Sequence, residues 1–145
     1  MHQLLNYVNQ KPVFKSFLKS LNTNQSVLNN ELSDESMVLL ILDAFFSSDQ
    51  SVFVITPNLY KAQLLYDHLS NVMDPQLLSF FPQDEFITTE LLVSSHEFKM
   101  ERINTIHHLL NNEKRIVVTH VSGAIKPQIP LQKWKDALMT LKINH

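Results

Sequence analysis

Hydrophobic positions along the chain follow two different spacings. Four segments place apolar residues at every third or fourth position, which is the period of a helix with one buried face. They are residues 12–21, 34–46, 59–72 and 97–110. Short apolar runs without that period separate these segments and predict buried strands. They are residues 26–28, 52–55, 77–80 and 116–119. A further apolar pattern around Trp134 predicts the beginning of a last helix.

The residues that flank these segments support the helix boundaries. Ser33 is a favourable N-cap, and Asp34 and Glu35 follow in the first turn, where the helix dipole stabilises carboxylates. Asn58 is a second N-cap residue, directly before the segment 59–72. In the helix that ends near residue 110, the spacing predicts an inward face. Its residues are Met100, Ile103, Ile106 and Leu110.

The alternation of strands and helices predicts an α/β fold with a mostly parallel sheet and helices on both faces. Ligands of such sheets bind at the carboxyl ends of the strands, because the loops that leave the sheet meet there. Binding chemistry is therefore expected in the segments that follow the strands. They are residues 29–36, 56–58, 81–93 and 119–123.

Residues 29–38 lie between the first predicted strand and the next helix, which is the position of a Walker A phosphate loop. Set on that pattern, the glycine positions fall on Glu31, Asp34 and Ser36, the lysine on Met37 and the magnesium-binding hydroxyl on Val38. Methionine brings no charge to a phosphate, valine cannot bind magnesium, and the carboxylates repel a triphosphate. From spacing alone, a strand–turn–helix that was never a phosphate loop explains the segment as well or better.

Composition narrows the choice of function. The 145 residues are 44% hydrophobic and 18% charged, which is typical of a globular domain, and Gly123 is the single glycine. An ordinary glycine-rich phosphate loop is therefore excluded. Without cysteine there are no disulfides and no thiolate metal sites. Because the N-terminus lacks a signal-peptide pattern, we expect a reducing, cytoplasmic location. The net charge of −2 argues against a dedicated nucleic-acid binder.

Five residues near the predicted strand ends are candidates for partner or loop contacts. They are Phe81, Asp84, Glu85, Phe86 and Arg102. The two acids follow Pro82, which interrupts the strand, so the magnesium-binding role of Walker B acids is not expected. For the aromatic residues, core packing is favoured over an exposed platform. Arg102 is expected to pair with an acid of the segment 84–90. The sequence indicates no catalytic group, no cofactor and no metal-ligand set.

Several segments, taken in order, resemble one protein family. They are the strand and turn 52–59, the helix residues Leu65-Tyr66, the run 79–86, the pair Glu101-Arg102 and the strand and turn 116–124. Together they resemble the first domain of the bacterial transcription-repair coupling factors over about residues 26–130. That domain is similar to the damage-recognition protein UvrB. The resemblance implies a P-loop NTPase or RecA-like fold (UvrB domain 1-like) with a degenerate Walker A loop. Relatives often keep glycines in that loop, whereas this chain has none.

The family also implies a function. A coupling factor is an ATP-dependent DNA translocase that dislodges RNA polymerase stalled at DNA damage and recruits UvrA. Its UvrB-like module is non-catalytic, and it supports UvrA recruitment and autoinhibition of the translocase in transcription-coupled nucleotide excision repair. Contacts to RNA polymerase and DNA belong to the full-length protein. Considered from its residues alone, the chain has an alternative interpretation as a nucleotide-binding or DNA-binding helicase-fold domain with an unusual phosphate loop.

The expected organisation has three parts. Residues 1–25 form an N-terminal helical segment, residues 26–126 form the UvrB-like α/β domain, and residues 127–145 form a linker and the start of a truncated next domain. The resemblance places much of the UvrA contact in that next domain. UvrA binding is therefore expected to need residues beyond this chain.

Overall fold

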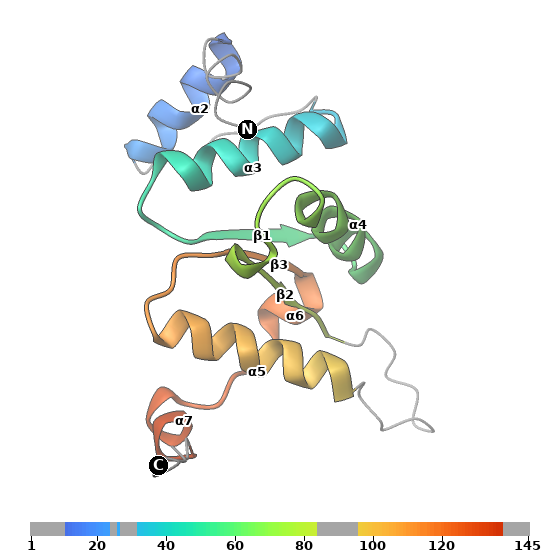
Figure 1. Ribbon diagram of the computed structural model, residues 1–145, viewed down its shortest axis with the longest axis vertical. Helices are drawn as coiled ribbons and strands as arrows, with labels where there is room; N and C mark the ends of the chain where they lie inside the picture. Colours follow the sequence, from blue (N-terminus) through green and yellow to red (C-terminus); the bar gives the residue numbers. More distant parts are fainter. Residues whose placement is uncertain (1–10, 24–25, 27–31, 84–95, 138–145) are drawn as a thin grey trace, which may run out of the picture.

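The sheet is small and parallel. The computed structural model describes residues 11–23, 26, 32–83 and 96–137 (Figure 1). Its strands are β1 (Val52–Thr56), β2 (Leu78–Phe81) and β3 (Ile116–His120). They run parallel in the order β1-β3-β2, with Val118 of β3 level with Val54 on one side and Phe80 on the other. Three of the predicted strands are thus confirmed, and the prediction at 26–28 lies outside the described residues except for Ser26.

The predicted helices are present as well. They are α2 (Pro12–Asn22), α3 (Asp34–Ser47), α4 (Leu59–Ser70), α5 (His96–Leu110), the short α6 (Val121–Ile125) and α7 (Leu131–Ala137), with a 3₁₀ turn η1 (Pro75–Leu77) before β2. Both predicted caps form, because the side chain of Ser33 accepts a hydrogen bond from the Ser36 N–H and that of Asn58 from the Lys61 N–H. Within the described ranges, no helix has both the length and the apolar content needed to cross a bilayer.

Helices cover both sides of the sheet. Figure 1 shows α3 and α4 on one side and α5 on the other, with α2 stacked on the outside of α3. The main core lies between the sheet and the first pair of helices, and its most buried members are Leu42, Leu69, Ile116 and Val118. β2 and β3 are buried on both faces, which explains their apolar runs. The predicted burial of β1 is wrong for one face, because Phe53 and Ile55 are exposed. The α/β fold with helices on both faces is therefore confirmed.

The predicted inward face of α5 is wrong for Met100 and Ile103, whereas Ile106 and Leu110 are half-buried. Met100 and Ile103 are 43% and 44% exposed, whereas Arg102 and Thr105 are buried. The reason lies in β2, which is an edge strand and needs hydrogen-bond donors for its outward carbonyls. Thr105 Oγ1 donates to the Phe80 carbonyl at 3.1 Å, so a polar face of α5 turns inward to close this edge.

A polar network holds the amino ends of β2 and β3 together. Arg115 is buried, and its guanidinium donates to Glu113 Oε2 at 2.9 Å and to Ser79 Oγ at 3.3 Å. The same Glu113 oxygen lies 2.7 Å from Nδ1 of His108. The hydrogen bond from Arg115, followed by the one from His108, lowers the pKa of Glu113 below its ordinary value of 4.5. The carboxylate is therefore held in its charged form by the fold.

This network predicts a pH dependence of stability. Since the pKa of Glu113 is lowered on folding, its contribution is present above pH 4.5 and is lost as the pH falls through the depressed value. We expect Glu113→Gln to lower the urea midpoint at neutral pH, and the difference from the native chain to shrink below about pH 4. Asp49→Asn, a change at an exposed loop acid, is the control. A difference that stays constant from pH 7 to 3 would contradict the assignment.

Candidate functional site

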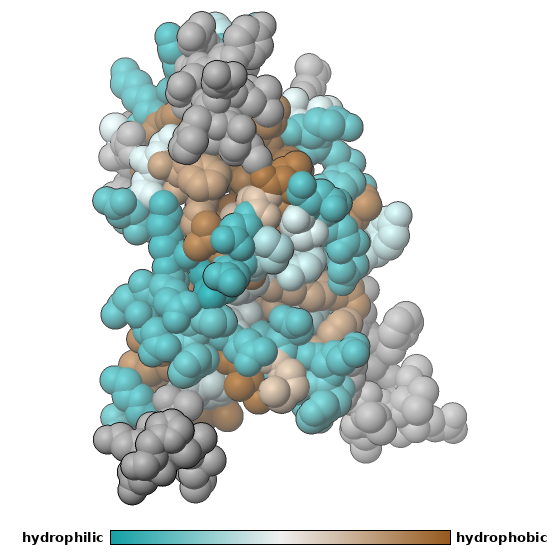
Figure 2. Space-filling model, in the orientation of Figure 1, coloured by the Kyte–Doolittle hydropathy of each residue, from teal (hydrophilic) through white to brown (hydrophobic). Residues whose placement is uncertain are grey.

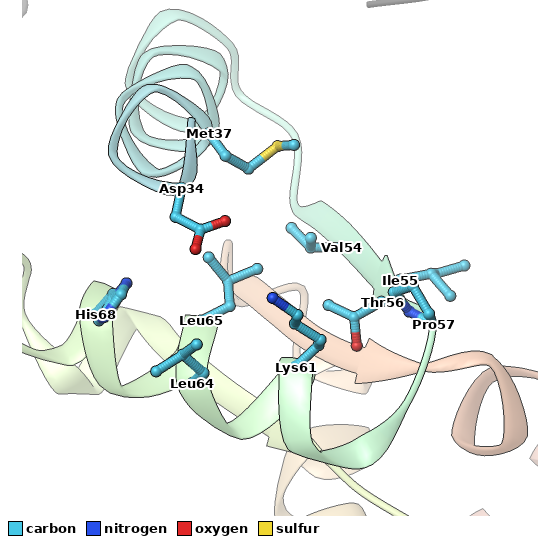
Figure 3. Close-up of a pocket in the computed structure, with 10 residues that line it drawn as sticks. All are labelled: Asp34, Met37, Val54, Ile55, Thr56, Pro57, Lys61, Leu64, Leu65 and His68. Atoms are coloured by element: carbon cyan, nitrogen blue, oxygen red, sulfur yellow. The ribbon is translucent and has the colours of Figure 1, made fainter. Parts of the chain in front are cut away.

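A cavity of about 330 Å³ lies at the carboxyl end of β1, between α3 and α4. This is the end of the sheet where the sequence predicts ligand binding. Figure 3 shows the residues that line it. They are Asp34, Met37, Val54, Ile55, Thr56, Pro57, Lys61, Leu64, Leu65 and His68.

The lining is largely apolar with a charged rim. Met37, Val54 and Leu65 supply much of the apolar wall, while Asp34 from α3 and Lys61 from α4 stand on opposite sides of the hollow (Figure 3). The described lining contains a single lysine and no glycine. A triphosphate needs several backbone donors and cations, so this cavity is better suited to an apolar group beside one positive charge.

The positions that the sequence analysis set on the Walker A pattern fall in and beside this cavity. Asp34 and Met37 line it, whereas Val38 is buried in the core beneath α3. Ser36 is engaged with the N-cap, because its N–H donates to Ser33 Oγ at 3.3 Å and its hydroxyl oxygen accepts from Ser33 at 3.1 Å. Glu31 lies outside the described residues. At the two key positions, Met37 brings no charge to a phosphate and Val38 has no oxygen with which to bind magnesium.

The first turn of α3 already carries its own anions. Asp34 and Glu35 both occupy it, next to the capping hydroxyl of Ser33. Backbone hydrogen bonding, followed by the hydrogen bond from Ser33, lowers the pKa of Glu35 from its ordinary value of 4.5. A helix N-terminus attracts an anion through its free N–H groups and its dipole. Here protein carboxylates and a side-chain cap take that place, which leaves little attraction for a phosphate.

Sequence reasoning missed two residues of this cavity, Lys61 and His68. Both lie on α4, on the same face as Leu64 and Leu65. The spacing 61, 64, 65, 68 is the helical i, i+3, i+4, i+7 stripe, so the pattern was present in the sequence. A stripe that mixes charged and apolar residues is typical of a solvent-exposed helix face. The sequence alone does not show that α3 overhangs this stripe of α4.

Arg102 lies at a second place, where β2 and β3 end. Its Nη1 donates to the carbonyls of Pro82 at 3.1 Å and Gly123 at 3.2 Å, and the guanidinium stacks 3.8 Å from the ring centroid of Phe81. Burial lowers the pKa of Arg102 from its ordinary value. The side chain therefore ties the end of β2 to α6, which is a structural role.

Of the predicted contact residues, the structure describes Phe81 and Arg102. Phe80 and Phe81 are buried, as core packing predicts. Asp84, Glu85 and Phe86 lie outside the described residues, so the expected ion pair between this segment and Arg102 stays a prediction. In the part of the chain that the structure describes, no group of three or more His, Asp or Glu side chains lies close enough to share a metal ion.

The single glycine of the chain has a packing role beside Arg102. A Cβ atom on Gly123 would meet Thr119 Oγ1 at 2.5 Å and the Phe81 carbonyl oxygen at 2.9 Å. The same threonine hydroxyl donates to that carbonyl at 2.6 Å. Only a residue without a side chain lets α6 approach the strand ends this closely.

The parallel sheet, its order and its flanking helices define an α/β domain consistent with the RecA-like and UvrB-like class. Comparison with curated proteins then supplies the family. The chain is 27% identical over 146 residues to the transcription-repair-coupling factor of Bacillus subtilis, which covers 100% of this chain and 12% of that protein. It is 30% identical over 113 residues to that of Staphylococcus aureus, covering 78% and 10%, and 24% identical over 141 residues to that of Staphylococcus epidermidis, covering 97% and 12%.

The chain is therefore homologous to a part of the transcription-repair-coupling factors, and the resemblance inferred from its sequence is confirmed. It spans about a tenth of the length of these relatives. No protein-family model matches the chain. No solved structure matches it either.

The contacts of Arg102 predict the effect of removing its charge. Arg102→Met keeps an unbranched chain over the Phe81 ring but leaves the carbonyls of Pro82 and Gly123 without their donor. We expect the free energy of unfolding to fall by about 2 kcal/mol in urea denaturation. Lys99→Met, on an exposed position of the same helix, should change it little. Equal effects of the two substitutions would contradict the structural role of Arg102.

The close approach at Gly123 gives a second stability prediction. Gly123→Ala forces the added methyl group against the Phe81 carbonyl, a backbone atom that cannot move aside alone. A loss of roughly 2 kcal/mol in the free energy of unfolding is expected. Ala124→Ser, at the exposed neighbouring position, serves as the control in the same thermal and urea melts. A Gly123→Ala chain as stable as the control would show that α6 does not pack as described.

Proposed function

We propose that this chain is the N-terminal UvrB-like module of a transcription-repair coupling factor and that it acts without catalysis of its own. Homology along the whole chain is the observation that carries this proposal, and it supports a role in transcription-coupled repair. The module helps to recruit UvrA and to restrain the ATP-dependent DNA translocase of the longer protein. Contacts to RNA polymerase and DNA belong to that longer protein, of which this chain covers about a tenth.

The site chemistry supports a non-catalytic module. In the cavity beside β1, Met37 stands at the Walker A lysine position and Asp34 at a glycine position. The carboxylates of the first turn of α3 take the place of a bound anion. The strand ends beyond β1 are occupied by structural contacts, in which Arg102 and Gly123 join β2 to α6. These features support the proposal that the described part of the chain has a nucleotide-type α/β architecture and binds no phosphate.

A division of labour follows from this proposal. The α/β domain at residues 26–126 forms the structural body of the module, with the helical segment 1–25 before it. Residues 127–145 lead into the following domain, which contributes much of the UvrA contact. UvrA capture by this chain alone is therefore expected to be weak, and capture by a longer coupling factor strong.

A thermal-shift titration with ATP and magnesium tests the absence of a nucleotide site. A true site at 100-fold saturation would add roughly 2.7 kcal/mol, which is several degrees in Tm for a domain of this size. We expect no shift for this chain, and a shift for the full-length Bacillus subtilis relative as the positive control. A clear magnesium-dependent shift would restore the alternative of a nucleotide-binding domain. If one appears, its loss in Lys61→Met would assign it to the cavity of Figure 3.

A pull-down with purified UvrA, run at low salt beside a DNA mobility-shift assay, tests the interaction side. Weak retention of UvrA by this chain and strong retention by a longer coupling factor, without DNA retarded by this chain, support an interaction module. Retarded DNA without UvrA retention favours the DNA-binding alternative, against the expectation from the net charge of −2.

A further inference from the structure

The charges of this chain are unevenly distributed along its sequence. Its first 30 residues contain three lysines and no aspartate or glutamate. The other 115 residues contain nine lysines and arginines and all 14 carboxylate side chains, so the net charge of −2 combines +3 in the first segment with −5 in the rest. The three lysines are Lys11, Lys15 and Lys19, and they belong to α2 and its N-cap.

These lysines lie along one side of α2 and form what we call the lysine stripe. They are four residues apart, slightly more than one helical turn, so the stripe covers about 12 Å of the helix. All three residues are exposed. Another side of α2 is apolar, because Phe14 is buried and packs with Leu40 of α3. The lysine stripe therefore lies outside the contact between α2 and α3.

Among the described elements, α2 lies outermost on its side of the molecule. Figure 1 shows it stacked on α3, away from the sheet, and Figure 2 shows hydrophilic surface at the upper left, where α2 lies. Two hydroxyl groups of this segment are turned to its own backbone. Ser20 Oγ donates to the Ser16 carbonyl at 2.9 Å, and Thr23 Oγ1 donates to the Lys19 carbonyl at 3.1 Å. The lysine ammonium groups are therefore the main polar groups that this surface offers to a partner.

The lysine stripe lacks counter-charges on its own helix. Among the residues that the structure describes, Lys15 and Lys19 form no ion pair with a carboxylate. Like charges four residues apart on a helix repel one another, so the stripe slightly destabilises α2 in the separate chain. An anionic partner would remove this repulsion. The stripe is thus complementary to a partner that carries negative charges.

Lipid and nucleic acid fit the lysine stripe less well than protein. A helix that binds a lipid surface inserts its apolar side, whereas Phe14 on the apolar side of α2 is buried against α3. Phosphate backbones are bound by hydroxyl groups together with lysines, and here the hydroxyls of Ser20 and Thr23 are engaged. A duplex is also a long polyanion, which the charge of −5 on the rest of the chain would repel.

An acidic helix of a protein matches the spacing of the lysines. Carboxylates at every fourth position of such a helix repeat at the same interval along its axis, so each lysine can face one carboxylate when the two helices lie side by side. Helices in coiled coils select their partners by pairing charges in this way. Complementary charges increase the association rate and the specificity more than the affinity.

We propose that the lysine stripe of α2 docks an acidic helix of a partner protein, with carboxylates at intervals of four residues. The proposal does not rest on the proposed function, because the charge, exposure and helical spacing of α2 carry it. Exposed ion pairs each contribute little, so the contact is weak and depends strongly on salt. It orients a partner rather than holding it alone.

Binding of a designed peptide tests the proposal. The probe is an alanine-rich helical peptide with glutamates at three positions spaced by four, and its control carries glutamines there. Fluorescence anisotropy of the labelled probe in about 20 mM salt should show saturable binding to this chain, and in about 300 mM salt most of the binding should be lost. The glutamine peptide should not bind in either buffer.

Two triple variants of equal net charge locate the contact. The first removes the lysine stripe. Its changes are Lys11→Gln, Lys15→Gln and Lys19→Gln. The second removes three exposed lysines of α5 and α7. Its changes are Lys99→Gln, Lys133→Gln and Lys135→Gln. The first variant should bind the glutamate peptide about 10-fold more weakly than the native chain, and the second should bind it nearly as well.

The folding of the variants is checked by thermal melts. Because the substitutions replace exposed side chains, both variants should melt within about 2 °C of the native chain. If the first variant melts much earlier, Lys15→Gln and Lys133→Gln are compared instead. The same order of affinities is then expected, with a loss of about 2-fold for Lys15→Gln.

Four results would overturn the proposal. Absence of binding to the glutamate peptide at low salt would show that the stripe docks no such helix. Equal losses in the two triple variants would show an effect of total charge alone. A duplex of about 15 base pairs that binds more tightly than the peptide, and loses affinity only in the first variant, would make nucleic acid the partner. Self-association that only the first variant abolishes would make a second copy the partner, through Glu97 and Glu101 of its α5.

The proposed function can fail separately. Stabilisation by ATP, or missing UvrA capture, would count against it without changing peptide binding by the lysine stripe. Absence of peptide binding would in turn leave the role in transcription-coupled repair standing, because that role rests on homology.

Discussion

The hydrogen bonds of β3 to both of its neighbours are the constraint on which the rest of this domain depends. Because β3 is paired on either side, every residue from Ile116 to His120 is buried, and helices must cover both faces of the sheet. α3 and α4 supply one cover and α5 the other. At the end of β3, polar groups lie in the protein interior. They need hydrogen-bond partners from neighbouring elements. Thr119 finds one in the Phe81 carbonyl.

The carboxyl ends of the strands are occupied by contacts within the protein. In a nucleotide-binding domain, backbone donors at this end are kept free for phosphate. Here the N-terminus of α3 is filled by Ser33 and its acidic neighbours, and the ends of β2 and β3 are joined by Arg102 and Gly123. Each of these contacts stabilises the protein itself, so the architecture does not need a ligand.

Much of the fold could be predicted from the sequence, because its causes are local. The apolar runs at β1 and β3 predict strands, and the side-chain oxygens of Ser33 and Asn58 predict where α3 and α4 begin. The face of α5 could not be predicted, since it depends on the unpaired carbonyls of β2, a strand that is distant in sequence. For the cavity, the sequence predicted only the end of the sheet at which it lies. The walls of the cavity depend on how α3 overhangs α4, and the hydrophobic periodicity of the sequence does not predict this arrangement.

The two edges of the sheet set the stability of the domain in different ways. At the β2 edge, Thr105 Oγ1 donates to the outward Phe80 carbonyl within the described residues. At the β1 edge, Phe53 and Ile55 are each more than half exposed. Full burial of such a side chain contributes about 1.5–3 kcal/mol, so covering both would add on the order of 2–3 kcal/mol before any backbone hydrogen bond is counted. That is a large share of the 5–15 kcal/mol by which domains are ordinarily stable. Among the described residues, apolar side chains thus stay half-exposed along β1, whereas α5 donates a hydrogen bond to β2.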